Sequence, residues 1–282
     1  MTTATSVRVA LEWAVRALAP TSDAARVEAE MLLGHSINKS RHYAYIWPER
    51  LITTAQYQRF EALCRRRAAG EPLAYIVRRR EFWSLDLEVT PATLIPRPET
   101  ECLVEAALAL VPPTATWRIA DLGTGSGAIA LAIATERPAC QILATDNSAG
   151  ALAVARQNAA RLGLGNICFS LGDWFAALGD RGYQMILSNP PYVADSDPHL
   201  ERGDLRFEPR SALVGGPDGL TQIRLIARQA RAYLVRNGRL LLEHGYDQGP
   251  QVCALLQGLG YQGVTDHRDY AGSQRFAEAV AP

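Results

Sequence analysis

Residues 119–128 read I-A-D-L-G-T-G-S-G-A and lie between two apolar stretches, at 118–122 and 128–135. The first stretch has the pattern of a strand and the second that of a helix. Gly123, Gly125 and Gly127 permit a tight turn and let a ligand approach the backbone closely. The segment therefore predicts a strand, a nucleotide-binding turn and a helix in succession, as in an α/β fold.

The alternation of strand and helix patterns continues from residue 101 to residue 282. Helices are expected at 102–110, 128–135, 148–162, 220–234 and 248–259, and strands at 118–122, 141–145, 167–171, 184–188, 239–243, 263–266 and 275–280. This order predicts an open parallel sheet with helices on both faces.

The N-terminal quarter of the chain has a different pattern. Helical periodicity at 9–18, 22–34 and 53–69 predicts a small helical domain over residues 1–72. The alternating stretch after Pro72 predicts a short hairpin, and Pro96 and Pro98 exclude regular structure. We expect a hairpin and linker at 73–100 and a catalytic domain at 101–282.

Composition excludes disorder and points to a reducing compartment. Hydrophobic residues make up 48% and charged residues 21% of the 282 residues. Residues 1–80 carry 13 basic and 7 acidic side chains, so the N-terminal part of the chain is basic, whereas residues 81–282 are acidic in balance.

The five cysteines show no pairing or metal spacing, and no segment has the length or apolarity of a signal peptide or membrane span. We expect a cytoplasmic monomer without metal, with no membrane association and no direct nucleic-acid binding.

An acidic residue ends the next expected strand. Asp146 lies 19 residues after Gly127, where it can accept hydrogen bonds from ribose hydroxyls. Gly123, Gly125 and Ala128 also satisfy the dinucleotide pattern G-x-G-x-x-A, so NAD remains open at this point. Asp121 favours S-adenosyl-L-methionine, because a carboxylate would attract its cationic amino group and repel a pyrophosphate.

A second motif, Asn189-Pro190-Pro191-Tyr192, follows the expected strand 184–188. A planar amide or aromatic amine is a poor nucleophile and must be oriented toward a methyl donor. The Asn189 side-chain oxygen and the Pro190 carbonyl can each accept one hydrogen of such an NH2 group. Tyr192 can pack against the flat group, so the motif predicts catalysis by positioning, without a classical base.

With these motifs the sequence resembles the protein-(glutamine-N5) methyltransferases that modify peptide chain release factors, the HemK/PrmC family. The matching stretches cover nearly the whole chain: P-L-A-Y-I, E-F-W, T-L-I-P-R-P-E-T-E, D-L-G-T-G-S-G-A-I-A, G-D-W-F, S-N-P-P-Y, F-E-P-R-S-A-L-V-G-G-P-D-G-L and L-L-E-H-G. The resemblance implies a Rossmann-like class I methyltransferase domain behind a helical head that helps to hold the release factor. It implies methylation of the glutamine in a Gly-Gly-Gln loop.

The resemblance also implies roles for particular residues. Donor-binding residues are expected to be Asp121, Gly123, Thr124, Gly125, Ser126, Gly127, Asp146, Asp173, Trp174 and Asn189, with Trp174 stacking on the adenine. The glutamine amide is expected to be held by Asn189, Pro190, Pro191 and Tyr192, with Asn189, Pro190 and Tyr192 catalytic. Arg97 either anchors the substrate or forms a loop salt bridge. The long loop 193–219 is expected to close over the substrate protein.

Two departures from the family and several rival functions remain. The C-terminal stretch A-G-S-Q-R-F-A-E-A-V-A-P lacks the short glycine-arginine ending that is usual in the family. The family usually has glycine where this chain has Arg78, so we expect a turn of altered shape there. Glutamine methylation of a ribosomal protein, N6-adenine methylation of nucleic acid, and donor binding without catalysis are the alternatives. Pro96-Arg97-Pro98 favours the release-factor branch, and the acidic balance of residues 81–282 argues against nucleic acid.

Overall fold

The computed structural model describes residues 5–282, and these divide into two compact units. One unit extends to Arg78 and also includes Arg202–Phe207, a short part of the long loop. The other unit contains Arg79–Glu201 and Glu208–Pro282. The first four residues of the expected head lie outside the described residues.

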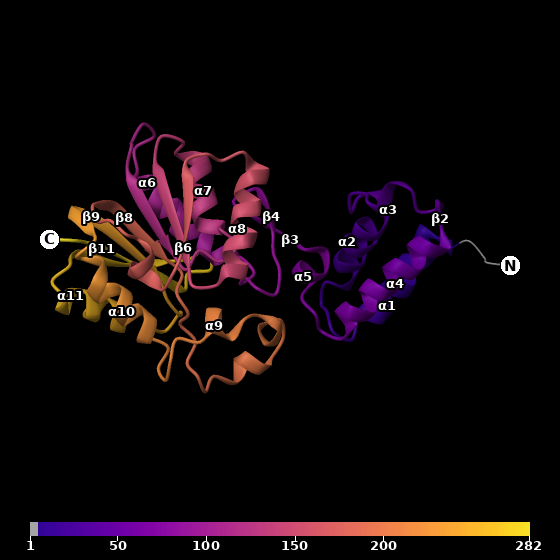
Figure 1. Cartoon of the computed structure of the whole chain (residues 1–282). Coiled ribbons are helices and arrows are strands. Elements are labelled where there is room, and N and C mark those ends of the chain that lie inside the picture. Colours follow the sequence, from indigo (N-terminus) through magenta and orange to yellow (C-terminus); the bar gives the residue numbers. More distant parts are fainter. Residues whose placement is uncertain (1–4) are drawn as a thin grey trace. The chain divides into compact units, whose positions relative to one another are not determined.

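The first unit is helical, as the sequence predicts (Figure 1). Its elements are β1 (Thr5–Ser6), α1 (Val7–Leu18), α2 (Ala25–Ile37), α3 (Tyr43–Ile46), β2 (Leu51–Ile52), α4 (Thr54–Ala68) and α5 (Leu73–Val77). A capping box between Thr53 and Gln56 begins α4, because each residue's side chain accepts a hydrogen bond from the other's backbone N–H. Leu11, Leu32 and Phe60 form part of the buried core. The sequence did not predict α3 or the two-residue pairing of β1 with β2.

The segment after Pro72 corrects the expected hairpin. Residues Leu73–Val77 form helix α5, and the hairpin begins only at Arg79, with β3 (Arg79–Phe82) and β4 (Leu85–Glu88). Arg78 ends α5 in the left-handed region, with φ of 58°. The arginine therefore adopts the backbone conformation that glycine favours, and the expected change in the shape of the turn stays a prediction.

The second unit contains a seven-stranded sheet, which confirms the expected α/β class. Its strands are β5 (Arg118–Leu122), β6 (Gln141–Asp146), β7 (Ile167–Leu171), β8 (Tyr183–Ser188), β9 (Leu234–Glu243), β10 (Gln262–Arg268) and β11 (Gln274–Val280). Their order is β10-β11-β9-β8-β5-β6-β7. The sheet is parallel from β9 to β7, but β11 pairs antiparallel with both β9 and β10, so the all-parallel expectation was wrong at this edge.

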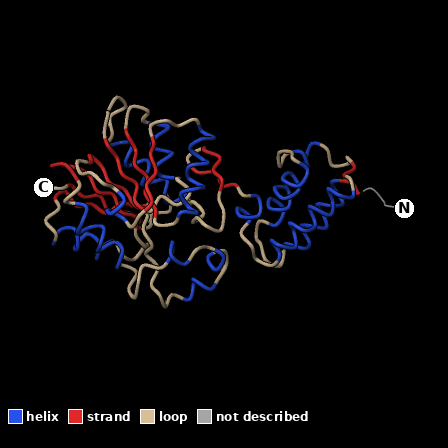
Figure 2. The backbone as a smooth tube through the Cα atoms, viewed as in Figure 1, coloured by secondary structure: helices blue, strands red, loops and turns tan. Residues whose placement is uncertain are grey.

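Helices cover both faces of the sheet (Figures 1 and 2). The main ones are α6 (Glu101–Leu110), α7 (Ala128–Glu136), α8 (Ala149–Leu162), α10 (Thr221–Ala230) and α11 (Gly249–Gly258). Alternate residues of each strand belong to different cores: Ile119 packs with α6 and α7, whereas Ala120 packs with α10 and α11. The expected helix 220–234 ends at Ala230, and Leu234 already begins β9.

The chain order places a ligand site at the ends of β5 and β8. In the sheet, β5 lies between β6 and β8. The connection from β5 leads to β6 on one side, and the connection from β8 leads to β9 on the other side, so the two connections run in opposite directions. Ligands of open α/β sheets bind at such switch points, beyond the carboxyl ends of the strands. The short helices of the connecting segments are η1 (Pro98–Thr100), η2 (Trp174–Ala177), η3 (Pro198–Glu201), η4 (Leu205–Phe207) and α9 (Arg210–Leu213).

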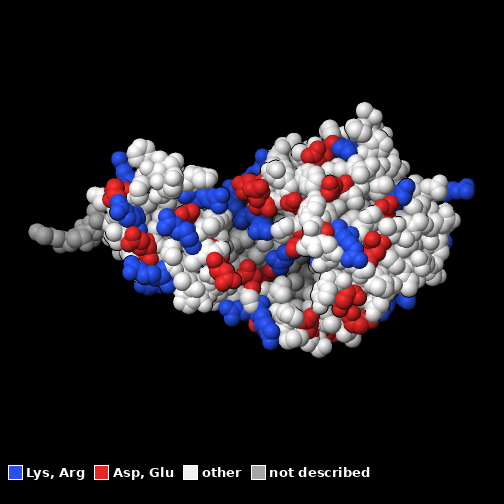
Figure 3. Space-filling view, turned by 180° about the vertical axis from the view of Figure 1, so that it is seen from behind, with Lys and Arg blue, Asp and Glu red and all other residues white. Residues whose placement is uncertain are grey.

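Three consecutive arginines near the end of α4 form ion pairs within the first unit. In the first unit, Arg65 pairs with Glu61, Arg66 with Glu71, and Arg67 with Glu28 and Asp204. On the face shown in Figure 3, basic and acidic side chains are interspersed over the helical unit. Within residues 5–282, no helix is long and apolar enough to cross a membrane.

Candidate active site

The glycine turn between β5 and α7 forms one wall of a pocket. Gly123, Gly125 and Gly127 all have positive φ, at 73°, 57° and 90°. A Cβ atom on Gly127 would lie 2.8 Å from Leu131, and one on Gly123 would lie 3.2 Å from the Trp174 ring. Only glycine therefore allows both the turn and the close packing of the wall.

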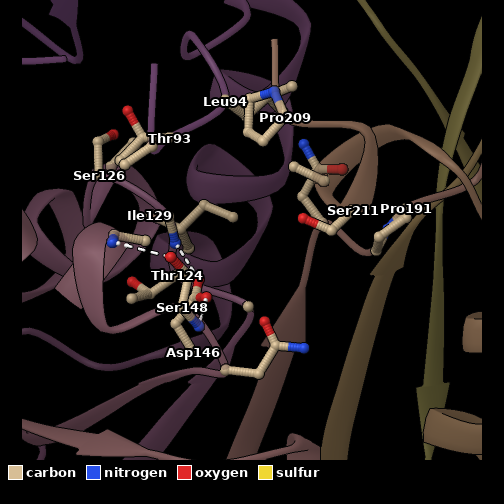
Figure 4. A pocket seen from close by; sticks show the side chains of 18 of the residues that line it. Thr93, Leu94, Thr124, Ser126, Ile129, Asp146, Ser148, Pro191, Pro209 and Ser211 are labelled. Carbon is tan, nitrogen blue, oxygen red and sulfur yellow. Dashed lines mark hydrogen bonds between the residues drawn. The ribbon is translucent and has the colours of Figure 1, made fainter. Parts of the chain in front are cut away.

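Asp146, at the end of β6, holds this turn in place. Its Oδ2 accepts the N–H of Gly125 at 2.9 Å, and its Oδ1 accepts the N–H of Ser148 at 2.8 Å. Burial raises the pKa of the carboxyl, and the backbone donors partly oppose this rise. A carboxylate has about four acceptor sites, and the two backbone N–H groups use two of them on Asp146. The other sites can accept hydrogen bonds from ribose hydroxyls. Figure 4 shows Asp146 grouped with Thr124 and Ser148, apart from Pro191 and Ser211.

Asp121 lies beneath the turn, not on the pocket wall. The residue is 1% exposed, and its Oδ2 accepts a hydrogen bond from the Thr124 hydroxyl at 2.6 Å. Burial raises its pKa to about 7, although the bond from Thr124 lowers it. A cation bound nearby would favour the ionised carboxylate.

Trp174 and Asp173 contribute to the same pocket from the loop after β7. Trp174 has a left-handed backbone, with φ of 43°, and its indole Nε1 donates to Gln222 Oε1 at 3.0 Å. This bond from α10 fixes the ring plane. An aromatic ring held in this way can stack on a nucleobase.

The Asn189–Tyr192 motif directly follows β8. The Asn189 Nδ2 donates to the Thr100 hydroxyl at 3.2 Å, and the Tyr192 hydroxyl donates to Glu243 Oε1 at 3.2 Å. Two loop glycines, Gly215 and Gly219, pack against the motif's backbone: a Cβ on either would lie within 2.5 Å of the Pro191 or Tyr192 carbonyl oxygen.

One pocket brings together most of the residues singled out in the sequence. Its lining includes Arg97, Gly123, Thr124, Gly125, Ser126, Asp146, Asp173, Trp174, Asn189 and Pro191. It does not include Asp121, Gly127, Pro190 or Tyr192. Gly127 is the N-cap residue just before α7, and Pro190 is buried. The partly buried Tyr192 ring packs against the core under α10 and α11. The structure therefore places the Tyr192 side chain outside the pocket lining, with its hydroxyl bound to Glu243.

Arg97 forms a loop salt bridge beside the pocket. Its guanidinium pairs with Glu208 Oε1, and the other carboxylate oxygen of Glu208 accepts the N–H of Ile95 at 3.0 Å. The Glu208 side chain is fully buried. Pro209, Ser211 and Ala212 follow it into the pocket lining, so this end of the long loop is part of the pocket.

Three supporting residues were missed from the sequence. Asn158 on α8 accepts the N–H of Glu88 and donates to the carbonyls of Glu88 and Ser126, at 2.7, 3.0 and 3.0 Å. Thr100 and Glu208 lie within the family-like stretches T-L-I-P-R-P-E-T-E and F-E-P-R-S, which were the signal available for them.

The residues present fit a nucleoside with a cationic tail better than a dinucleotide. Asp146 has free acceptor sites, Trp174 offers an aromatic ring, and the buried Asp121 adds negative charge beneath the turn. Among the described residues that line the pocket, Arg97 is the one basic side chain, and it is paired with Glu208. The described lining residues therefore offer no unpaired basic side chain to bind a pyrophosphate.

The doubly wound sheet, the glycine-turn pocket at its switch point and the adjacent Asn-Pro-Pro-Tyr segment define a Rossmann-like methyltransferase. Family models agree: residues 100–203 match the Methyltransferase small domain, and residues 9–77 match the PrmC N-terminal domain. The chain belongs to the release factor glutamine methyltransferase family.

Relatives with that name match along nearly their whole length. The chain is 50% identical over 254 residues to the release factor glutamine methyltransferase of Salmonella typhimurium, covering 90% of this chain and 91% of the relative. It is 48% identical to the one from Coxiella burnetii, covering 97% and 98%. A methyltransferase structure from Pyrococcus furiosus has 19% identity and a TM-score of 0.54 over 70% of this chain and 88% of that one, and supports the fold alone.

Proposed function

We propose that this protein transfers a methyl group from S-adenosyl-L-methionine to the side-chain amide nitrogen (N5) of the glutamine in the Gly-Gly-Gln motif of class 1 peptide chain release factors. The observation that carries the proposal is a single pocket with Gly123–Gly127, Asp146 and Trp174 in one part and Asn189 and Pro191 in another. The names of the full-length relatives support the same substrate. A cytoplasmic reaction follows from such a substrate.

The donor supplies an electrophilic methyl group on a sulfonium sulfur. Asp146 would hold the ribose, Trp174 would stack on the adenine, and the ionised Asp121 would favour the cationic tail from beneath the turn. The Nδ2 of Asn189 is engaged by Thr100, which leaves its Oδ1 available to accept a hydrogen from the glutamine NH2.

Positioning and electrostatics then carry the reaction. Asn189 and the Pro190 carbonyl would turn the nitrogen toward the methyl group. The new C–N bond forms as the S–C bond breaks, and the nitrogen loses its proton to water afterwards. The loop 193–219 would close over the bound release factor.

Mass spectrometry of a purified class 1 release factor, incubated with this protein and S-adenosyl-L-methionine, tests the proposal. We expect a gain of one methyl group, about 14 Da, on the glutamine of the Gly-Gly-Gln motif. Methylation of a ribosomal-protein glutamine, or of adenine in nucleic acid, without modification of the release factor would overturn it.

A further inference from the structure

Gln248, at the start of α11, is an unusual residue for its position. It is the N-cap residue of the helix, yet its side chain makes no cap hydrogen bond. Asn, Asp, Ser and Thr are preferred at this position, because their short side chains accept N–H groups of the first turn. The Gln248 side chain is partly buried and forms its hydrogen bonds outside its own helix, so capping does not explain it.

The side-chain amide of Gln248 joins two backbone groups. Its Oε1 accepts the N–H of Gly245 at 2.8 Å, and its Nε2 donates to the carbonyl of Tyr192 at 2.9 Å. Gly245 lies just after β9, whereas Tyr192 is the last residue of the Asn-Pro-Pro-Tyr motif after β8. The amide therefore ties the motif to the segment that follows the neighbouring strand.

The two partners fix the orientation of this amide. A backbone N–H can only donate and a backbone carbonyl can only accept, so Oε1 must face Gly245 and Nε2 must face Tyr192. The Gly245 carbonyl accepts the N–H of Gln248 at 3.0 Å and lies 2.9 Å from Nδ1 of the buried His244 ring, which must donate to it. Gly245 is thus held through both its backbone groups, and it holds the amide that reaches the motif.

A glycine of the long loop leaves room for the bond to Tyr192. A Cβ atom on Gly219 would lie 2.2 Å from the Tyr192 carbonyl oxygen and 2.7 Å from Gln248 Nε2. The next residue of the chain, Val193, accepts the N–H of Gly215 at 2.8 Å and donates to the Leu213 carbonyl at 2.9 Å. The loop and Gln248 therefore hold the end of the motif together.

The direction of the motif's backbone is important for the proposed reaction. The Pro190 carbonyl is one of the two acceptors proposed for the glutamine NH2, and it lies two residues before the carbonyl that Gln248 binds. The ring of Pro191, between them, fixes one of the intervening backbone torsions. A displacement of about 1 Å at a reacting group can cost about 100-fold in rate.

We propose that Gln248 is a positioning residue that holds the Asn-Pro-Pro-Tyr backbone, through the Tyr192 carbonyl, in the direction that methyl transfer requires. The inference rests on the proposed function, because it takes the Pro190 carbonyl as an acceptor for the substrate amide. Gln248 is not among the residues that line the pocket, so it acts through the motif and not on the substrate.

Gln248→Glu separates the two hydrogen bonds of the amide. An ionised glutamate keeps an acceptor for Gly245 but places a second acceptor against the Tyr192 carbonyl. On the release factor, kcat and kcat/KM should fall together about 10- to 100-fold, with unchanged affinity for S-adenosyl-L-homocysteine. Gln251→Glu makes the same change of charge at an exposed position of α11 and should keep wild-type kinetics. Wild-type kinetics in Gln248→Glu would overturn the proposal.

Gln248→Ala removes both hydrogen bonds and distinguishes positioning of the motif from support of α11. We expect kcat to fall about as far as in Gln248→Glu, because both variants lose the donor to Tyr192. If Gln248 served only to hold Gly245, the loss would be confined to Gln248→Ala, and that result would overturn the proposal. Thermal unfolding of each variant controls for loss of fold.

A third readout does not depend on turnover. The side-chain NH2 resonances of Gln248, identified by their absence in Gln248→Glu, should exchange with water about tenfold more slowly than those of the exposed Gln251. Equal exchange rates would mean that the bond to Tyr192 does not form and would overturn the inference. If wild type transfers no methyl group, the proposed function fails, and these rates still decide whether Gln248 binds the motif.

Discussion

The carboxylate of Asp146 accepts the backbone N–H of Gly125 across 2.9 Å, and this bond ties the end of β6 to the glycine turn after β5. The same carboxylate accepts the N–H of Ser148 at the start of α8. Asp146 therefore shapes the turn before any ligand binds, and its remaining acceptor sites face the pocket that it lines.

Asp146→Asn should weaken donor binding, because the neutral amide replaces one acceptor oxygen with a donor nitrogen. Hydrogen bonds to charged groups contribute about 1.5–3 kcal/mol, so we expect affinity for S-adenosyl-L-homocysteine to fall about 10- to 100-fold by calorimetry. Asp180→Asn, which removes an exposed carboxylate, is the matched control and should bind normally. Equal affinity in Asp146→Asn and wild type would contradict the assigned role.

Donor affinity should depend on pH through Asp121. Burial raises the pKa of this carboxyl to about 7, so it is partly protonated at neutral pH without ligand. A bound cation favours the ionised form, so binding requires loss of that proton at lower pH and should tighten as pH rises from 6 to 8. Between pH 6 and 8 the gain is limited to about tenfold, because a carboxyl with a pKa of about 7 changes from about nine-tenths protonated to about one-tenth protonated in the free protein.

Asp121→Asn separates this effect from other titrating groups. The asparagine carbonyl can still accept the Thr124 hydroxyl, but it cannot ionise. Calorimetry with S-adenosyl-L-homocysteine should show weaker binding that no longer changes between pH 6 and 8. If the variant kept the pH dependence of wild type, another group would be responsible.

Asn158 should be important for stability although it binds no ligand. Asn158→Ala leaves the N–H and carbonyl of Glu88 and the carbonyl of Ser126 without their buried partner. We expect a loss of about 2–3 kcal/mol in the free energy of unfolding, measured by urea denaturation. Gln257→Ala, at an exposed position of α11, should change stability by less than about 0.5 kcal/mol. A similar small change in Asn158→Ala would show that the bonds contribute little.

Arg78→Gly should stabilise the protein. Arg78 has φ of 58°, and the left-handed region costs an L-residue about 1–2 kcal/mol. Glycine removes this strain but makes the unfolded chain more flexible, so we expect a net gain of about 1 kcal/mol. Arg79→Gly in the adjacent strand β3 should destabilise instead. Destabilisation by Arg78→Gly would mean that the arginine side chain contributes more than the strain costs.

The sequence predicted those parts of the fold and site that depend on neighbouring residues. The turn at Gly123–Gly127 and the acid at the end of β6 are local patterns of apolar strand, glycine and polar residue, and the structure has them where they were expected. The end of α10 was missed because the apolar pattern runs on through Tyr233 and Leu234 into β9. A left-handed residue inside β9, Asn237, also interrupts its alternation.

Supporting contacts were not predictable in this way. Thr100 meets Asn189 across 89 residues of sequence, and Arg97 meets Glu208 across 111. No periodicity links such positions, because the register of the sheet and the path of the loop bring them together. For the same reason, the side chain of Tyr192 was expected in the pocket, whereas its hydroxyl binds Glu243.

The most direct test of the account compares methyl transfer and donor binding in Asn189→Ala. Turnover on the release factor, followed by mass spectrometry, should fall at least 100-fold, because the glutamine amide loses its acceptor. Affinity for S-adenosyl-L-homocysteine, measured by calorimetry on the same preparation, should stay within about threefold of wild type, since the donor-binding turn is untouched. Turnover close to that of wild type would contradict the claim that Asn189 orients the substrate amide.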